Sequence, residues 1–323
     1  MFQRLFRLFI PTLNSYTPVR HSFFRDEAIA DRLHKEGYCV VDFIDKQQQE
    51  ALLDLYEKHH QLSVENPGVF FGTFSSNKNY RRIVHYTTNK ILESSFDQWF
   101  VDYKSAVNTF VVKTPGKSTL VPIHQDGAAL DEKKYSSINV WIPLQPINSL
   151  NGALSIVPRS HNIFYPFRCN SIPPITKNIE RELHPFFKPI YLNLGQAIFF
   201  DSRLFHYSEP NMAEQNRVAM LSRICPKRSS IVAYFKEDRE GASIEMFECA
   251  EEYLVSTVGY EDCERPVQAK LIKTFNANIA PISSGQFAEL RSKFGIVEQQ
   301  SPAKENQEEF NFLKEPKGWL HGG

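Results

Sequence analysis

The sequence predicts a mainly β fold, an antiparallel sandwich or jelly roll, with helices around it. From about residue 108 to 235 the chain consists of short runs of strand-forming residues separated by Pro, Gly and Asn. Many short strands with turn residues between them are typical of antiparallel sandwiches and jelly rolls. Helical patterns occur before and after this region, which places the helices at the flanks of the β core.

A helix, a strand and a second helix are expected, in that order, after about residue 25. Gly37 ends the first helix, and residues 38–43 are rich in strand formers. Asp45 is expected to cap the second helix, which ends near His59 and His60. Adjacent histidines point in different directions on a helix, so these two are interpreted as a solvated helix end and not as a metal-binding pair.

Residues 63–85 allow two interpretations. The segment combines turn formers with three phenylalanines and two arginines. It forms either a mobile flap over a pocket or a segment whose aromatic side chains are buried in the core.

Seven strands are expected in the central region. Trp141 lies in one of them, which ends at Pro143. A Pro-rich insertion at residues 158–188 interrupts the strands, and an insertion of this kind often shapes the rim of an active site. The expected strands are residues 108–113, 119–123, 137–144, 153–157, 189–193, 197–201 and 217–224.

The chain is expected to form one domain over residues 1–323, because it contains neither an internal repeat nor a long linker. The jelly-roll core covers about 105–235, with helical support at 25–104 and a C-terminal extension at 236–323. The extension includes a helix at about 283–295 that ends at Gly295. Its polar tail, about 297–323, is expected to be flexible.

The charge balance excludes a typical nucleic-acid binder. Lys plus Arg and Asp plus Glu number 37 each, so the formal net charge is zero, whereas nucleic-acid binders carry a basic excess. The five cysteines are widely spaced and form no C-x-x-C pair, which indicates reduced thiols in a cytoplasmic protein. The N-terminus has no acidic residue before Asp26 and carries several arginines, so mitochondrial targeting is the alternative. No stretch is long enough to span a membrane.

The pair His124 and Asp126, in "VPIHQDGAAL", is weak evidence for a metal site by itself. His206 follows a predicted strand some 80 residues later and is expected in a turn region. A jelly roll brings such distant segments together at its mouth. Two imidazoles and one carboxylate form the facial triad of non-haem Fe(II) oxygenases, which leaves three coordination positions open. Gln125 lies between two of these ligands. Its side chain is expected to point away from the metal if the segment is extended, and it has no assigned role.

An arginine is available to bind a 2-oxo acid at this metal. Arg217 stands 11 positions after His206 at the start of a predicted strand, and a guanidinium can make two parallel hydrogen bonds to a carboxylate. Ser208 can add a hydroxyl donor. Arg223 competes for this role, but six residues further along it is expected to lie beyond the pocket.

These motifs together resemble the phytanoyl-CoA dioxygenase family of Fe(II)/2-oxoglutarate-dependent oxygenases. The matching stretches, over about residues 25–225, are "KEGYCVVDFIDKQQQEALLDLYEKHH", "HQD", "WIPLQPINSLNGALSIVPRSH" and "HYSEPNMAEQNR". The resemblance implies a double-stranded β-helix in which His124, Asp126 and His206 bind iron. It also implies that Arg217 and Ser208 anchor 2-oxoglutarate.

The sequence departs from the family pattern at Arg159, where members often have Gly. Residues 158–188 show no feature that indicates acyl-CoA binding, so a coenzyme A thioester is not implied. Because related halogenases carry Gly or Ala in place of Asp126, the resemblance favours hydroxylation over halogenation.

Several other residues are candidates for the site. Trp141 belongs either to the core or to the pocket wall, and Lys113 is expected to contact the co-substrate or the substrate. Arg81 and Arg82 either clamp an anionic substrate or are solvated surface arginines. Phe71 and Phe74 are candidate substrate contacts. His161 is interpreted as structural, and no role is assigned to His85 or His184.

The predicted function is hydroxylation of an unactivated C–H bond of a small molecule, with release of succinate and CO2. The expected cofactors are Fe(II), 2-oxoglutarate and O2. The substrate is expected to carry an anionic group, and an amino acid, a lipid and a natural-product intermediate all fit. Two alternatives stay open: a cupin-like hydrolase or isomerase that uses the triad without 2-oxoglutarate, and a non-catalytic binding module.

Overall fold

A six-stranded antiparallel sheet forms the larger layer of the fold in the computed structural model, which describes residues 16–60, 68–237, 242–257 and 264–299. The strand order is β1-β8-β5-β10-β3-β2, and each neighbouring pair is antiparallel. The strands are β1 (Tyr38–Asp42), β2 (Val69–Phe71), β3 (Tyr103–Lys113), β5 (Ile138–Pro143), β8 (Gln196–Asp201) and β10 (Arg217–Pro226).

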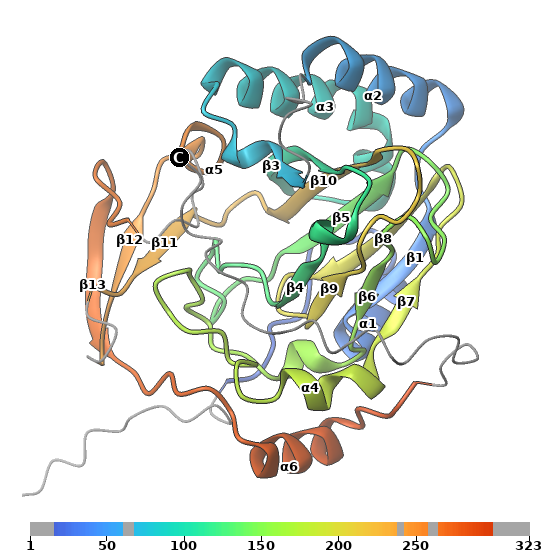
Figure 1. The fold of residues 1–323 in the computed structure, drawn as a ribbon. Coiled ribbons are helices and arrows are strands. Elements are labelled where there is room, and N and C mark those ends of the chain that lie inside the picture. Colours follow the sequence, from blue (N-terminus) through green and yellow to red (C-terminus); the bar gives the residue numbers. More distant parts are fainter. Residues whose placement is uncertain (1–15, 61–67, 238–241, 258–263, 300–323) are drawn as a thin grey trace, which may run out of the picture.

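A four-stranded antiparallel sheet faces the inner side of the larger one (Figure 1). Its strands are β4 (Val121–His124), β6 (Leu154–Ile156), β7 (Lys188–Ile190) and β9 (His206–Ser208), in the order β4-β9-β6-β7. Trp141 and Ile198 of the larger sheet share a buried cluster with Leu154 and Ile156 of the smaller one. From β3 to β10 the chain crosses repeatedly between the two sheets, with β6 and β7 as a consecutive antiparallel pair in the smaller one. This winding is compatible with a jelly roll. The predicted mainly β fold with flanking helices is confirmed.

Strand β9 corrects the sequence-based prediction, which placed His206 in a turn region. Only three residues long, it pairs with β4 on one side and β6 on the other. Its sequence, His-Tyr-Ser, carries no run of β-branched residues to indicate a strand. The pairing with neighbours far away in the sequence therefore determines its conformation.

Two long helices cover the outer face of the larger sheet (Figure 1). They are α2 (Lys46–His59) and α3 (Lys78–Trp99), and α1 (Glu27–Glu36) precedes β1. The predicted signals at Gly37 and Asp45 are confirmed: Gly37 ends α1 with a φ of 83°, and Asp45 forms a capping box with Gln48. Leu52 of α2 and Leu92 of α3 are fully buried in the same core cluster.

Helix α3 settles the conformation of the last part of residues 63–85. Residues 61–67 lie outside the described part of the chain, but Asn77 caps α3 by accepting a hydrogen bond from the Tyr80 backbone N–H. Tyr80 and Val84 then pack into the core. Residues 78–85 therefore begin a helix and do not form a flap.

The C-terminal extension adds a third sheet and a helix, and both share a core with the jelly roll. Met246 and Phe287 of the extension lie in one buried cluster with Phe167 and Tyr207. The sheet has the order β11-β12-β13, and the predicted helix is confirmed as α6, which ends at Gly295. The bounds are β11 (Val232–Phe235), β12 (Ser243–Glu248), β13 (Lys270–Asn276), α5 (Tyr253–Ser256) and α6 (Ser284–Phe294). The remaining short helices are α4 (Glu180–Leu183), η2 (Gly72–Phe74), η3 (Lys117–Thr119), η4 (Ser160–Asn162) and η5 (His184–Phe186).

Among the described residues, no helix is both long and apolar enough to cross a membrane. The Arg-rich stretch that resembles a targeting peptide falls largely on residues 1–15, and most of the tail predicted to be flexible falls on residues 300–323. Both of these ranges lie outside the described part of the chain.

Candidate metal centre and co-substrate site

Strands β4 and β9 bring the three predicted metal ligands together. His124 ends β4 and is the direct cross-strand partner of His206, which begins β9. The centroids of their imidazole rings lie 4.1 Å apart. Asp126 follows two residues after His124, and its Oδ1 lies 4.0 Å from His206 Nε2. One ligand atom from each of the three residues falls within 4.8 Å of the others.

Both histidines present the same nitrogen to the space between the ligands. His124 Nδ1 lies 2.8 Å from the Pro122 carbonyl oxygen, and His206 Nδ1 lies 2.9 Å from that of Leu204. A carbonyl oxygen only accepts hydrogen bonds, so each Nδ1 carries the proton and each Nε2 keeps a lone pair for a metal. Burial lowers the pKa of His206 to about 4, which keeps this imidazole neutral at physiological pH.

The Asp126 carboxylate is held by two side chains of the larger sheet. Asn139 Nδ2 donates a hydrogen bond to Asp126 Oδ2 at 2.5 Å, and Arg223 Nη2 lies 3.6 Å from Oδ1. Burial by itself raises the pKa of this carboxyl group, but attraction to His206, Arg223 and His124 outweighs it and leaves the pKa below its usual value. Asp126 is therefore ionised and ready to bind a cation.

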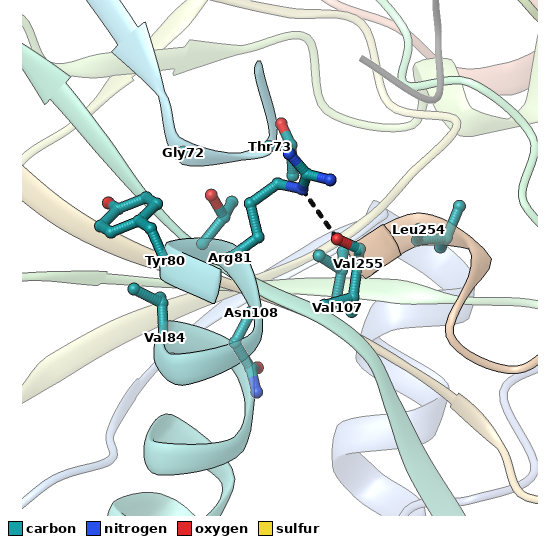
Figure 2. Close-up of a pocket in the computed structure, with 10 residues that line it drawn as sticks. Gly72, Thr73, Tyr80, Arg81, Val84, Val107, Asn108, Leu254 and Val255 are labelled. Carbon is teal, nitrogen blue, oxygen red and sulfur yellow. Dashed lines mark hydrogen bonds between the residues drawn. The ribbon is translucent and has the colours of Figure 1, made fainter. Parts of the chain in front are cut away.

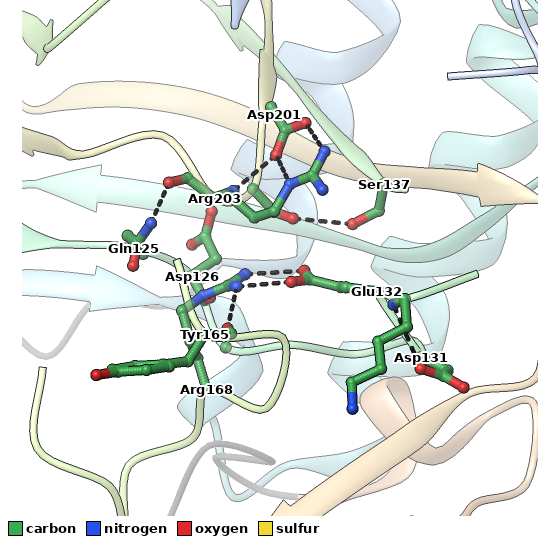
Figure 3. Close-up of polar contacts among 12 residues, drawn as sticks. Gln125, Asp126, Asp131, Glu132, Ser137, Tyr165, Arg168, Asp201 and Arg203 are labelled. Carbon is green, nitrogen blue, oxygen red and sulfur yellow. Dashed lines mark hydrogen bonds and ion pairs between the residues drawn. The ribbon is translucent and has the colours of Figure 1, made fainter. Parts of the chain in front are cut away.

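Gln125 has a structural role that its sequence position did not suggest. Its Nε2 donates hydrogen bonds to the carbonyl oxygens of Ile163, at 3.0 Å, and of Arg203 (Figure 3). Arg203 is itself fixed by a buried ion pair with Asp201. Gln125 does point away from the metal ligands, as expected, but it ties the metal-binding segment to the chain that leads into β9.

The backbone around Asp126 is fixed from two further directions. The Asp126 N–H donates to the Ser202 carbonyl oxygen at 3.0 Å. Arg168 Nε donates to the Asp126 carbonyl oxygen at 2.9 Å, while the Arg168 guanidinium pairs with both carboxylate oxygens of Glu132 (Figure 3). The ligand therefore sits on a rigid segment, as a metal site requires.

Arg217 is a buried cation with incomplete hydrogen bonding. Its residue exposure is only 1%, and within the described part of the chain its Nε and Nη1 have no hydrogen-bond partner. The guanidinium lies 5.2 Å from the centre of the ring of Trp141, which belongs to a buried core cluster. Burial lowers the pKa of Arg217 to about 9, and the side chain remains charged at neutral pH.

Lys113 and Ser208 lie on the inner side of the fold near Arg217. Lys113 is the direct cross-strand partner of Arg217, and its Nζ donates to the Ser208 carbonyl oxygen at 2.9 Å and to that of Glu209. Burial, together with repulsion from Arg217, lowers the pKa of Lys113 to about 6. Ser208 lies two residues beyond His206 in the same strand, so its side chain shares the face of the metal ligand.

The predicted substrate contacts have other partners. Arg81 Nε and Nη2 donate to the carbonyl oxygens of Val255 and Ser256 at 2.8 and 2.7 Å (Figure 2), and Arg82 pairs with Glu252. These contacts fasten α5 to α3 and argue against the predicted anion clamp.

The two phenylalanine candidates lie at the edge of the larger sheet. Phe71 belongs to the edge strand β2, and Phe74, in η2, is 46% exposed. Their rings contact each other with centroids 6.0 Å apart. None of the four predicted substrate contacts belongs to the group of side chains that surrounds Asp126.

A small hollow that is open to solvent adjoins the metal-binding segment. One wall consists of residues 127–129, Arg168 and Cys169, and the other of residues 232–234 with Tyr253 and Leu254. Leu254 also lines a second hollow of about 210 Å³, which includes Arg81 (Figure 2). The C-terminal extension therefore supplies part of the surroundings of the site.

Sequence reasoning missed Asn139 and misplaced Arg223. A signal for Arg223 was present, because an even separation of six residues along a strand puts Arg217 and Arg223 on the same face of the sheet. Arg223 therefore lies beside the predicted metal ligand Asp126. Nothing in the sequence alone connects Asn139 to Asp126.

Comparison with known proteins identifies a family. The family model described as phytanoyl-CoA dioxygenase (PhyH) matches residues 33–219. No curated protein matches the chain.

Several solved structures are similar at low sequence identity. The carbocyclase SnoK from nogalamycin biosynthesis, described as non-haem and α-ketoglutarate-dependent, is 17% identical with a TM-score of 0.43, covering 67% of this chain and 89% of SnoK. AviO1 from Streptomyces viridochromogenes Tue57 is 18% identical with a TM-score of 0.45, covering 66% and 98%. HygX from Streptomyces hygroscopicus, solved with nickel, 2-oxoglutarate and hygromycin B, is 13% identical with a TM-score of 0.45, covering 66% and 90%. Because the family model matches more than half of the 323 residues, the chain belongs to the phytanoyl-CoA dioxygenase family.

Proposed function

We propose that the protein is an Fe(II)- and 2-oxoglutarate-dependent oxygenase that hydroxylates an unactivated C–H bond of a small molecule. The observation that carries this proposal is the buried guanidinium of Arg217, whose Nε and Nη1 lack hydrogen-bond partners in the described chain. Leaving a buried cation unpaired is costly, so this position favours the entry of an anion. A hydrolase or isomerase using the triad alone would not need such a cation.

The donor set of the triad suits Fe(II). His124 and His206 would bind it through Nε2 and Asp126 through Oδ1, leaving three positions of an octahedral ion open. The single carboxylate leaves a net positive charge on the centre, which favours chelation by an anionic 2-oxo acid.

Arg217 and Ser208 would bind the distal carboxylate of 2-oxoglutarate, which is the role that the buried guanidinium fits. Trp141 covers one face of the guanidinium and keeps water from it. When iron, 2-oxoglutarate and O2 are bound, they supply oxidation of a C–H bond with release of succinate and CO2. The residues of the chain hold these groups and orient the substrate toward them.

The hollow next to residues 127–129 is the place that we propose for part of a small-molecule substrate. Its walls combine small residues such as Ala128 and Ala129 with the aromatic rings of Tyr234 and Tyr253, a lining that fits an apolar molecular body. Arg81 and Arg82 do not support an anionic group on the substrate, because both side chains bind at α5.

Turnover of 2-oxoglutarate tests the proposal. Protein loaded with Fe(II) without oxygen should form succinate once O2 is admitted, and candidate small molecules should raise that rate when they bind. Absence of succinate under all conditions, with iron bound at the triad, would favour the hydrolase or isomerase alternative.

A further inference from the structure

Asn139 of β5 and Arg223 of β10 reach the metal ligand Asp126 from the inner face of the larger sheet. The two residues are direct cross-strand partners, and they are 0% and 3% exposed. Neither belongs to the metal triad or to the anchor for the distal carboxylate. Each contacts a different oxygen of the same carboxylate.

The two oxygens of Asp126 therefore have different surroundings. Oδ2 accepts the 2.5 Å hydrogen bond from Asn139 and is turned toward the sheet. Oδ1 faces His206 Nε2 at 4.0 Å, across the space where a metal would bind. Arg223 Nη2 is 3.6 Å from Oδ1, longer than a hydrogen bond, so it attracts this oxygen without occupying its lone pairs.

Arg223 also fixes the orientation of Asn139. Its Nη1 donates to the Gly127 carbonyl oxygen at 3.0 Å, and its Nε donates to Asn139 Oδ1 at 3.4 Å. Because the oxygen of the Asn139 amide faces the guanidinium, its NH2 group must face Asp126. Hydrogen bonds thus run in one direction, with Arg223 donating to Asn139 and Asn139 donating to Asp126.

We propose that Asn139 and Arg223 are positioning residues that restrict Asp126 to monodentate metal binding through Oδ1. This inference rests on the proposed function. An octahedral ion with three protein donors has three open coordination positions. A chelating 2-oxo acid uses two of them, and O2 needs the third. If Asp126 turned and bound through both oxygens, the position for O2 would be lost.

Counting metal-bound water tests this assignment without turnover. Mn²⁺ in place of iron relaxes the protons of every exchangeable water that it holds. The wild-type Mn²⁺ protein should lose about two of its three waters when 2-oxoglutarate binds and keep one. In Asn139→Leu, the same complex should lose the last water, so that proton relaxation falls to the level of an ion without bound water.

Arg223→Lys is the second variant, because it keeps a buried positive charge but cannot hold Gly127 and Asn139 together. It should show a partial loss of the last water and a fall in Mn²⁺ affinity of roughly 10-fold, as is usual when a residue that supports a metal ligand is changed. Arg265→Gln, which removes an exposed ion pair with Glu245, is the matched control and should match the wild type.

The outcomes separate the two proposals. If 2-oxoglutarate displaces no water from the wild-type Mn²⁺ protein, the proposed function is wrong. If it does, and both folded variants keep the last water as the wild type does, the positioning role is wrong. A fall in Mn²⁺ affinity that only parallels a fall in melting temperature, with the water count unchanged, would indicate a purely structural role and also overturn the inference.

Discussion

Arg217 and Lys113 are direct cross-strand partners in β10 and β3, so two buried basic side chains lie next to each other. Burial lowers the pKa of both groups, to about 9 for Arg217 and about 6 for Lys113. The neighbouring carbonyl oxygens satisfy Lys113, whereas two nitrogens of Arg217 have no partner among the described residues. The nitrogens of Arg217 without partners, and not Lys113, therefore support the proposed binding of an anion here.

Arg217→Met should have opposite effects on the free protein and on ligand binding. Removal of an unpaired buried charge should raise the melting temperature of the free protein. The KM for 2-oxoglutarate should rise roughly 100-fold, because about 3 kcal/mol of charge-assisted hydrogen bonding is lost. Succinate assays and thermal melts with and without 2-oxoglutarate measure both effects. An unchanged KM would remove Arg217 from the co-substrate site.

Asp126→Ala and His206→Ala should each reduce succinate formation to the background rate while the protein stays folded. Each change removes one of three metal donors, and the two that remain bind Fe(II) weakly. Equilibrium dialysis with Mn²⁺ checks metal binding independently of turnover. Retention of both metal and turnover in either variant would contradict the assignment of the triad.

Arg159 is expected to combine backbone strain with a stabilising contact. Its φ of 69° lies in the left-handed region, while its guanidinium pairs with Glu36 and donates to the Gly295 carbonyl oxygen. Arg159→Ala keeps the strain and loses the contacts, whereas Arg159→Gly also removes the strain. The free energy of unfolding, measured in urea, should therefore be about 1 kcal/mol higher for the Gly variant than for the Ala variant. Equal stability of the two variants would show that the strain is negligible.

His85 should make the protein less stable in mild acid. Burial lowers the pKa of His85 to about 4, and its Nδ1 accepts a hydrogen bond from the Asn108 backbone N–H at 3.2 Å. The unfolded chain binds a proton near pH 6.5 and the folded chain only near pH 4, so stability falls as the pH drops through this window and changes no further below it. The full effect is at most about 3 kcal/mol.

His85→Asn keeps a hydrogen-bond acceptor and removes the titrating group. The free energy of unfolding of this variant, measured by denaturant titration between pH 7 and pH 4, should depend less on pH than that of the wild type. Parallel curves for the two proteins would assign the acid sensitivity to other groups.

Arg81→Gln should weaken the attachment of α5 without affecting co-substrate binding. The change leaves carbonyl oxygens of Ser75, Val255 and Ser256 without their buried donor, at a cost of about 2 kcal/mol. Hydrogen exchange should become faster in residues 253–256, while the KM for 2-oxoglutarate stays at the wild-type value. A raised KM with unchanged exchange would restore Arg81 as a ligand-binding residue.

Local signals allowed the sequence to predict much of the fold. Gly37 and Asp45 mark helix ends through backbone conformation and capping, which depend only on neighbouring residues. The strands of the jelly roll were predicted where β-branched and aromatic residues are dense. Strand β9 was missed because it is held by its neighbours and not by its composition.

The sequence was sufficient to bring out His124, Asp126 and His206 as candidate metal ligands, and the structure places these three side chains together. The contacts of Asn139 and Arg81 were not predictable. Asn139 of the larger sheet meets Asp126, which follows β4 of the smaller sheet, because the two sheets face each other. Arg81 binds carbonyl oxygens more than 170 positions away in the sequence. Such partners depend on how the sheets and helices pack, which a single sequence does not show.

The contact between β11 and the metal-binding segment has a consequence for how this enzyme family can diversify. The Val232 N–H donates to the carbonyl oxygen of Ala129, which is three residues after Asp126, at 2.9 Å. Val232 itself lies beyond the residues that the family model matches. One stretch of the chain thus encodes the metal ligands, and another supplies the facing wall of the hollow. If the proposed substrate contacts this hollow, changes in residues 232–234 can alter which molecule binds without changing His124, Asp126 or His206.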